Sequence, residues 1–226
     1  MIAGDEHTGT GPRIQHMSET QSHWEKIYAT RDPSAVSWYQ PHLNISLQLI
    51  GRAGILPTDG IIDVGGGSST LVDDLLDRGF RNLSVLDISS RAIVISRRRL
   101  GPRADLVHWI RDDALNAPLP VGDYRLWHDR AVFHFLTHPT SRRAYIEQVR
   151  RALMPGGFAL IATFSLEGPT TCSGLQVCRY SAETLAGEFG NDFRIVESRP
   201  EDHMTPSSIK QAFVYCLLAF EEKRSR

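Results

Sequence analysis

The chain has 226 residues, of which 41% are hydrophobic and 23% are charged, so it is long enough for one globular domain with a substantial core. Its formal net charge of -1 excludes a global basic field, and binding to nucleic acid would need a local patch. The dense basic run Arg97-Arg98-Arg99 ends a predicted helix, where positive charges interact favourably with the helix dipole. We therefore expect no nucleic-acid partner.

Cysteine usage and hydropathy indicate a protein of a reducing compartment. Cys172, Cys178 and Cys216 form neither a CxxC pair nor an even disulfide framework. No apolar run reaches the roughly 18 residues of a membrane span, and the polar first residues lack the apolar core of a secretory signal. We predict a cytoplasmic protein without a membrane partner, with a flexible tail over residues 1–18 and a single domain over residues 19–226.

The predicted elements begin with two helices, over residues 19–29 and 42–53, which precede the first strand. From residue 60 onward, short apolar runs alternate with helical segments, a pattern that predicts an α/β sandwich with a parallel sheet. Strands are predicted at 61–64, 83–86, 106–109, 124–128 and 158–164, and helices at 70–78, 91–100, 132–136, 141–153 and 182–189. Strands 193–197 and 211–220 are expected to form a hairpin-like pair at the sheet edge, because the polar segment between them is too short for a crossover helix.

The segment 61–70 carries the clearest functional pattern and reads Ile-Ile-Asp-Val-Gly-Gly-Gly-Ser-Ser-Thr. A buried strand delivers the chain to the carboxyl edge of the sheet, and a turn without side chains lets a ligand approach the backbone. The amides at the start of the following helix then face the bound group. Glycines also serve ordinary tight turns, so this pattern alone predicts only a nucleotide-cofactor loop.

Two further acids follow the next two predicted strands. Asp87, followed by Ile88, stands where a carboxylate meets the two ribose hydroxyls of a nucleotide, although it could instead cap the helix that follows. Asp113, followed by Ala114, ends the third strand and can accept a hydrogen bond from an adenine amino group. The combination of a strand, a glycine turn and a later acid in one segment favours the ribose role for Asp87.

These motifs, with the sequence Leu-Met-Pro-Gly-Gly at 153–157, resemble the ordered motifs of class I S-adenosylmethionine-dependent methyltransferases over about residues 24–220. The resemblance implies a Rossmann-like, seven-stranded sheet that is mostly parallel with an antiparallel last strand. It also implies S-adenosyl-L-methionine as the cofactor and an N-terminal helical lid over the site. One departure is Ser69, where many members of the family carry a third glycine.

The resemblance assigns the parts of the cofactor to particular residues. It places the methionine part near Gly65, Gly66 and Gly67, the ribose at Asp87 and the adenine at Asp113 and Ala114. Our predicted cofactor set also includes Asp63, Ile88 and His128.

A nicotinamide-binding dehydrogenase is the nearest competing interpretation, since it also uses a glycine loop and a ribose acid. Its GxGxxG pattern fails at the last position, where this chain carries Thr70. The acid at Asp63 and the Pro-Gly-Gly turn at 155–157 also favour the methyl donor.

The residues after strand 124–128 should lie beside the reactive methyl group, because ligands bind beyond the carboxyl ends of such strands. His128 and Asp129 are candidates for a general base and the group that orients it. Alternatively, His128 caps the strand while Asp129 pairs with Arg130 in a structural network. His134 is a further candidate, but its apolar surroundings favour a core histidine.

The predicted substrate contacts are Trp38, Tyr39, Arg130, His134 and Cys172. The two N-terminal aromatics follow a proline-containing loop, and aromatic faces attract a sulfonium cation. Cys172 lies in a polar segment, 163–175, that is expected to be a flexible loop. Together with Cys178 it does not establish a metal site, so we predict no metal, and purely structural cysteines remain an alternative.

The predicted function is methyl transfer from S-adenosylmethionine to a small molecule by in-line displacement, to which positioning contributes much of the acceleration. A base matters for an alcohol or phenol acceptor and less for a thiolate or a neutral amine. The compact chain favours a small acceptor. The alternatives are a protein methyltransferase acting on lysine or another side chain, and a non-catalytic cofactor-binding protein of the same fold. The pattern leaves the acceptor atom and the oligomeric state open.

Overall fold

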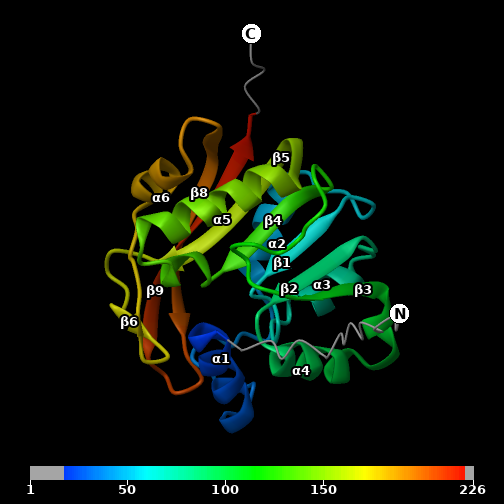
Figure 1. The fold of residues 1–226 in the computed structure, drawn as a ribbon, viewed down its shortest axis with the longest axis vertical. Helices are drawn as coiled ribbons and strands as arrows, with labels where there is room; N and C mark the ends of the chain where they lie inside the picture. Colours follow the sequence, from blue (N-terminus) through cyan, green and yellow to red (C-terminus); the bar gives the residue numbers. More distant parts are fainter. Residues whose placement is uncertain (1–17, 222–226) are drawn as a thin grey trace, which may run out of the picture.

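The computed structural model describes residues 18–221, so the predicted tail lies outside the described residues except for Ser18. A seven-stranded sheet forms the centre of the molecule, in the order β3-β2-β1-β4-β5-β9-β8 (Figure 1). The strands are β1 (Ile61–Val64), β2 (Leu83–Asp87), β3 (Val107–Arg111), β4 (Tyr124–Arg130), β5 (Leu153–Phe164), β8 (Phe193–Met204) and β9 (Lys210–Phe220). Strands β1 to β5 are parallel, and β9 runs antiparallel to both β5 and β8. The expected mostly parallel sheet with an antiparallel last strand is confirmed.

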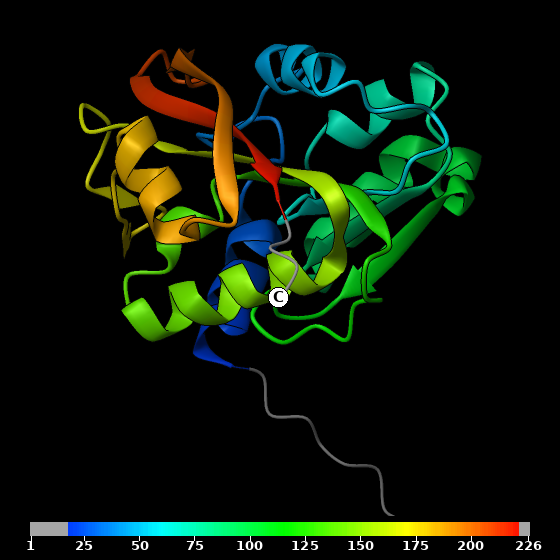
Figure 2. The ribbon, with the colours of Figure 1, turned by 90° about the horizontal axis from the view of Figure 1, so that it is seen from above.

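Helices cover both faces of this sheet, as Figure 2 shows for α2 and α5. The helices are α1 (Glu19–Thr30), α2 (Asn44–Arg52), α3 (Leu71–Asp77), α4 (Ser90–Leu100), α5 (Pro139–Ala152) and α6 (Ala182–Phe189). Side chains of α2 and α3 pack into one buried cluster, and those of α5 and α6 pack into a second cluster on the opposite face. Across residues 18–221, every helix is too short or too polar to span a bilayer.

Alternation along the strands decides which cluster each side chain joins. On β1, Ile61 belongs to the cluster beneath α2 and α3, whereas Ile62 belongs to the one beneath α5 and α6. On β4, Leu126 and Trp127 divide in the same way. Successive residues of a strand point to opposite faces of the sheet. The polar side chains at the end of β4 therefore also alternate between the two faces.

Two strands extend far beyond their predicted bounds, because proline and glycine do not end them. β5 begins at Leu153, and the Pro-Gly-Gly sequence forms an irregularity at which the register with β4 shifts. β8 continues through Pro200 to Met204, where only 193–197 was expected. Proline is tolerated there because β8 is an edge strand, with one side of its backbone unpaired.

Two shorter segments also differ from their predictions. The predicted helix at 132–136 is only the three-residue 3-10 helix η2 (Phe133–Phe135). The segment expected to be a flexible loop contains a small hairpin, formed by β6 (Thr171–Cys172) and β7 (Leu175–Gln176). A second 3-10 helix, η1 (Gly101–Leu106), leads from α4 into β3.

Candidate active site

A cavity lies at the carboxyl edge of the parallel strands. Its volume is about 970 Å³, including the solvent at its mouth. Part of its wall comes from the ends of β1, β2 and β3, through Gly65, Asp87, Ile88, Asp113 and Ala114. The strand order places β4, β5 and β9 on the other side of β1. Those strands, α1, the segment between α1 and α2, η2 and β6 contribute to the rest of the wall. Its residues include Trp24, Tyr28, Trp38, Arg130, Phe164, Cys172, Gln211 and Phe213.

The glycine loop has the conformation and the close contacts that only glycine permits. Gly65 has a φ of +67°, and a Cβ atom there would collide with the side chain of Val132. At Gly67, a Cβ atom would lie 2.5 Å from Oδ2 of Asp87, and it would also collide with Ala92. The loop therefore needs these glycines to pack against the neighbouring strand end as well as to admit a ligand.

Asp87 links the glycine loop to the end of β2. Its carboxylate oxygens accept hydrogen bonds from the amides of Gly67 (3.0 Å) and Ser89 (2.7 Å). Burial raises the pKa of Asp87 to about 6, the two amides oppose the rise, and the negative charges of Asp63 and Glu25 add to it. The alternative role as helix cap is wrong, because Ser89 is the N-cap of α4 and accepts from the amide of Ala92.

Asp113 and Ala114 line the same cavity one strand further along the sheet. Asp113 accepts the amide of Leu115 at 3.0 Å, and its own amide donates to Asp112 at 2.8 Å. These bonds hold a compact turn after β3. The acid predicted for adenine therefore lies on the same cavity as the acid predicted for ribose.

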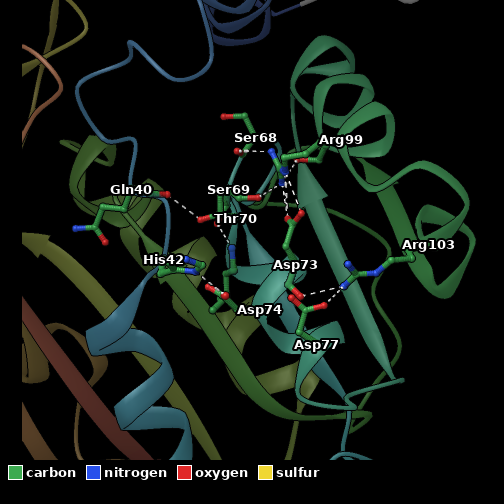
Figure 3. A network of polar contacts seen from close by, with 12 residues as sticks. Gln40, His42, Ser68, Ser69, Thr70, Asp73, Asp74, Asp77, Arg99 and Arg103 are labelled. Carbon is green, nitrogen blue, oxygen red and sulfur yellow. Dashed lines mark hydrogen bonds and ion pairs between the residues drawn. The ribbon is translucent and has the colours of Figure 1, made fainter.

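Ser69, which replaces the family's third glycine, is accommodated by a clamp from α4 (Figure 3). Arg99 donates to the carbonyl oxygens of Ser68 and Ser69 and pairs with Asp73 at 2.7 Å. The hydroxyl of Ser69 accepts the amide of Leu71 at 3.1 Å, which satisfies a donor at the start of α3. A serine at this position thus serves the helix start without blocking the packing of α4.

Helix α1 lies over the site and is attached to the start of α4. Glu25 accepts hydrogen bonds from both the amide and the hydroxyl of Ser90, each at 2.7 Å. This carboxylate satisfies free donors at a helix N-terminus, where negative charge is also favoured. From the same helix, Trp24 packs edge-on against Trp38 (5.9 Å between ring centroids) and Phe135 (5.2 Å), so it both anchors α1 and lines the cavity.

His128 forms a buried chain with two residues beneath the glycine loop. Its Nδ1 lies 2.7 Å from Oδ1 of Asp63, and its Nε2 lies 2.9 Å from the hydroxyl of Ser46 on α2. Oδ2 of Asp63 has no hydrogen-bond partner within residues 18–221. Asp63, His128, Gly66 and Tyr39 line a second, smaller cavity of about 460 Å³ on that side of the loop.

The expected pairing of His128 with Asp129 is wrong, because the two consecutive strand residues point to opposite faces of the sheet. Asp129 accepts the amides of Val132 (2.8 Å) and Phe133 (3.0 Å) and the hydroxyl of Tyr145 on α5. Burial raises the pKa of Asp129 to about 6, against the effect of these bonds. The carboxylate thereby holds the turn after β4.

The alternative network, in which Asp129 pairs with Arg130, is also absent from the described residues. Arg130 instead donates to the hydroxyl of Tyr215 (2.7 Å) and the carbonyl of Trp38 (2.9 Å), and it lies 3.5 Å from Glu201. The next residue, Ala131, has a φ of +75°, which is uncommon for a residue with a side chain. Backbone strain of this kind is concentrated at functional sites.

The remaining predicted substrate contacts are only partly brought together. Trp38, Arg130 and Cys172 line the large cavity, whereas Tyr39 lines the smaller one, to which Trp38 and Arg130 also contribute. Burial raises the pKa of the Cys172 thiol, and no three His, Cys, Asp or Glu side chains within residues 18–221 group closely enough to hold a metal ion.

His134 is a core residue, and its predicted contact with substrate is wrong. It is fully buried, lines neither of these two cavities, and accepts the amide of Phe164 at 3.4 Å. Burial, and then the charge of Arg130, lower its pKa to about 3.

Sequence reasoning missed Tyr28, Phe164, Gln211 and Phe213, which all line the large cavity. Phe164 ends β5, so its position at the carboxyl edge could have been predicted. Gln211 and Phe213 lie at the start of β9, and the first residues of an antiparallel strand lie at the same edge as the last residues of its parallel neighbours.

Comparisons with known proteins indicate a methyltransferase. Residues 61–157 match a family described as a methyltransferase domain. Human EEF1A lysine methyltransferase 2 is 21% identical over 80% of this chain and 77% of its own length. The eEF1A lysine and N-terminal methyltransferase of Danio rerio is 24% identical over 69% of this chain, but the match spans only 23% of that relative.

Among solved structures, the fold is similar to that of a Burkholderia thailandensis N1-methyltransferase with bound 1,6-didemethyltoxoflavin and S-adenosylhomocysteine. The TM-score is 0.69 at 17% identity, and the similarity covers 90% of this chain and 88% of the other.

The residues present fit S-adenosylmethionine. The buried oxygen of Asp63 without a partner lies beside the glycine loop, and Asp87 and Asp113 face one continuous cavity. When bound, the cofactor supplies a methyl group activated by a sulfonium. Residues 61–157 thus match a methyltransferase domain, and the seven-stranded sheet has the fold of class I S-adenosylmethionine-dependent methyltransferases.

Proposed function

We propose that this enzyme methylates a small molecule that is enclosed in the part of the large cavity formed by β4, β5, β9 and α1. The observation that carries the proposal is the division of the cavity along the strand order. The strand ends with cofactor-type acids lie on one side, and a mainly aromatic wall lies on the other. Such enclosure excludes water and orients the acceptor toward the methyl group.

For the cofactor, we assign roles according to position in the sheet. Asp87 with Ile88 would hold the ribose, and Asp113 with Ala114 the adenine, because they follow neighbouring strands on one wall. Each Asp87 oxygen already accepts one amide and has a second lone pair for a ribose hydroxyl.

For the methionine part, we assign Gly65, Gly66 and Gly67 together with Asp63. His128 then acts as a positioning residue for Asp63, because its ring fixes one carboxylate oxygen and leaves the other without a partner within residues 18–221. We assign no general base to His128 or Asp129, since both are buried and occupied by hydrogen bonds within the fold.

The second candidate function is methylation of a protein side chain. It is favoured by the names of the relatives, which are lysine methyltransferases of eEF1A. A lysine side chain would have to enter a cavity of which α1 forms part of the wall, and Glu25 attaches that helix to α4. The aromatic wall itself suits either kind of acceptor, since aromatic rings hold both planar molecules and cations.

The experiment that separates these functions follows a labelled methyl group. The full chain is incubated with methyl-labelled S-adenosylmethionine and a cell extract, and the products are divided into small molecules and protein. We expect the label in the small-molecule fraction. Label only in protein supports the second candidate. Calorimetric binding of S-adenosylhomocysteine with no label in either fraction would indicate a non-catalytic cofactor-binding protein.

A further inference from the structure

The part of the cavity assigned to the acceptor contains one cation that the fold itself holds in place. Arg130 ends β4, its guanidinium lies 4.6 Å from the ring centre of Phe213, and its side chain is only 6% exposed. Tyr215, Glu201 and the carbonyl of Trp38 hold it from three directions. A long, flexible side chain is thereby fixed in a single position on the cavity wall.

These contacts leave part of the guanidinium without partners. Arginine has five N–H donors, and within residues 18–221 each of its three nitrogens makes one protein contact. Two N–H groups on the terminal nitrogens therefore have no acceptor in the described chain. The contact with Glu201, at 3.5 Å, is also long for a charge-assisted bond. A buried donor without an acceptor is costly, so a ligand oxygen at this point would be strongly favoured.

Glu201 is not available to attract a cationic acceptor. It accepts hydrogen bonds from Tyr215 (2.8 Å) and Gln40 (2.8 Å) in addition to its contact with Arg130. The carboxylates that do line the cavity are Asp87, which ends β2, and Asp112 and Asp113, which follow β3, all on the cofactor side. The acceptor side thus presents a positive charge and aromatic rings.

The positive charge of Arg130 extends over neighbouring groups. It contributes, after burial, to the lowered pKa of His134 and to that of His203. A charge that disfavours imidazolium in this region also disfavours an ammonium group and favours an anion.

A second polar group lies on the same wall. Gln211, at the start of β9, is 8% exposed, and its amide oxygen has no hydrogen-bond partner within residues 18–221. The rings of Trp24, Tyr28 and Phe164 complete this side. Flat aromatic walls favour a planar ring, because ring pairs contribute beyond their buried area.

We propose that the methyl acceptor is a planar aromatic compound that carries an oxyanion, such as a carboxylate, and that this oxyanion pairs with Arg130. Gln211 then supplies an amide at the edge of the same ring. This inference rests on the proposed small-molecule function and narrows it to one chemical class. A lysine side chain, which is cationic before it reacts, would meet the like charge of Arg130.

The test uses one ring in three charge states and does not depend on turnover. Indoleacetate, indoleacetamide and tryptamine are titrated into the full chain saturated with S-adenosylhomocysteine, and binding is followed by calorimetry. We expect the anion to bind about tenfold to a hundredfold more tightly than the amide, as for one charge-assisted contact, and the ammonium to bind most weakly. The anthranilate and anthranilamide pair extends the test to a smaller ring.

Variants of β4 connect this preference to Arg130. Arg130→Met combined with Glu201→Gln removes both charges without leaving a buried carboxylate unpaired, and it should abolish the preference for the anion. Arg130→Lys keeps the charge but not the planar fork, so part of the preference should remain. The matched control is Arg125→Met, since Arg125 lies on the same strand, 5.2 Å from the ring centre of Phe158.

The proposal is overturned if tryptamine binds best, if no anion binds the cofactor-product complex, or if the folded Arg130 variants keep the full preference. These outcomes are separate from failure of the proposed function, which would place the methyl label in protein. If the Arg130 variants do not fold, the charge series on the unaltered chain still decides the question.

Discussion

Substituting Gly67 with alanine would test whether the glycine loop and Asp87 form one unit. The added Cβ atom would lie 2.5 Å from Oδ2 of Asp87 and would collide with the side chain of Ala92. Asp87 would have to move, which would break its bond with the Gly67 amide. Gly67 does not have a positive φ, so the perturbation is one of space and not of backbone conformation.

The size of the effect can be worked out from these contacts. Overpacking costs about 1–3 kcal/mol, and loss of a hydrogen bond to a charged group costs about 1.5–3 kcal/mol. In a domain of this size, each kcal/mol lowers the melting temperature by roughly 2–4 °C. Displacement of Asp87 should also weaken binding of S-adenosylhomocysteine by at least about tenfold, the loss of one such contact.

The assay is thermal unfolding with and without S-adenosylhomocysteine, together with calorimetric titration. The matched control is Gly187→Ala within α6, where a Cβ atom would meet nothing within 4 Å. That control should stabilise the protein by about 0.5–1 kcal/mol, because alanine is the better helix former. The reasoning is refuted if Gly67→Ala melts no lower than the unaltered protein and binds the ligand equally well.

Three further predictions concern Asp87, His128 and Arg99. The folded-state pKa of Asp87 is raised to about 6, so the apo protein should lose stability as the pH rises from about 4 through 6. Because the ionised carboxylate would accept the ribose hydroxyls, affinity for S-adenosylhomocysteine should fall by up to about tenfold per pH unit below 6. Calorimetry across this range should show no such slope for Asp87→Asn, and an unchanged slope would count against the ribose role. His128→Leu leaves both oxygens of the buried Asp63 without partners and should cost about 3–5 kcal/mol in denaturant unfolding, against about 1 kcal/mol for Ser46→Ala. Equal losses in these two variants would contradict the chain from Ser46 to Asp63. Arg99→Met removes the clamp on Ser68 and Ser69 and should lower both melting temperature and cofactor affinity, whereas Arg103→Met, which removes an exposed pair with Asp77 and a contact with the carbonyl of Asp73, should lower the melting temperature less and leave the affinity unchanged. The account of the clamp fails if the two arginine variants behave alike.

Two of the strands that carry the cofactor residues could be predicted because they are buried on both faces. All residues of β1 and β2 are buried, and these strands appear in the sequence as short, mainly apolar runs with an acid at or near the end. Their common edge then follows from parallel topology. For this reason the positions of Gly65, Asp87 and Asp113 around one cavity followed from sequence alone.

The acceptor side could be predicted only in part, because segments far apart in sequence form it. The strand predicted to end at His128 continues to Arg130, which separates His128 and Asp129 onto opposite faces. The strand predicted to end at residue 197 continues through Pro200, and this part of β8 brings Glu201 to Arg130. Proline is a weak signal for the end of an edge strand, because the N–H group that it lacks can lie on the side of the strand that pairs with no neighbour.

A crystal structure of the full chain with S-adenosylhomocysteine would test the division of the cavity most directly. The account predicts that the ribose hydroxyls contact Asp87 and that the adenine lies at Asp113 and Ala114. It further predicts that the sulfur faces the side lined by Arg130 and Phe164. A ligand whose adenosine occupies the aromatic side, or one that makes no contact with Asp87, would contradict it.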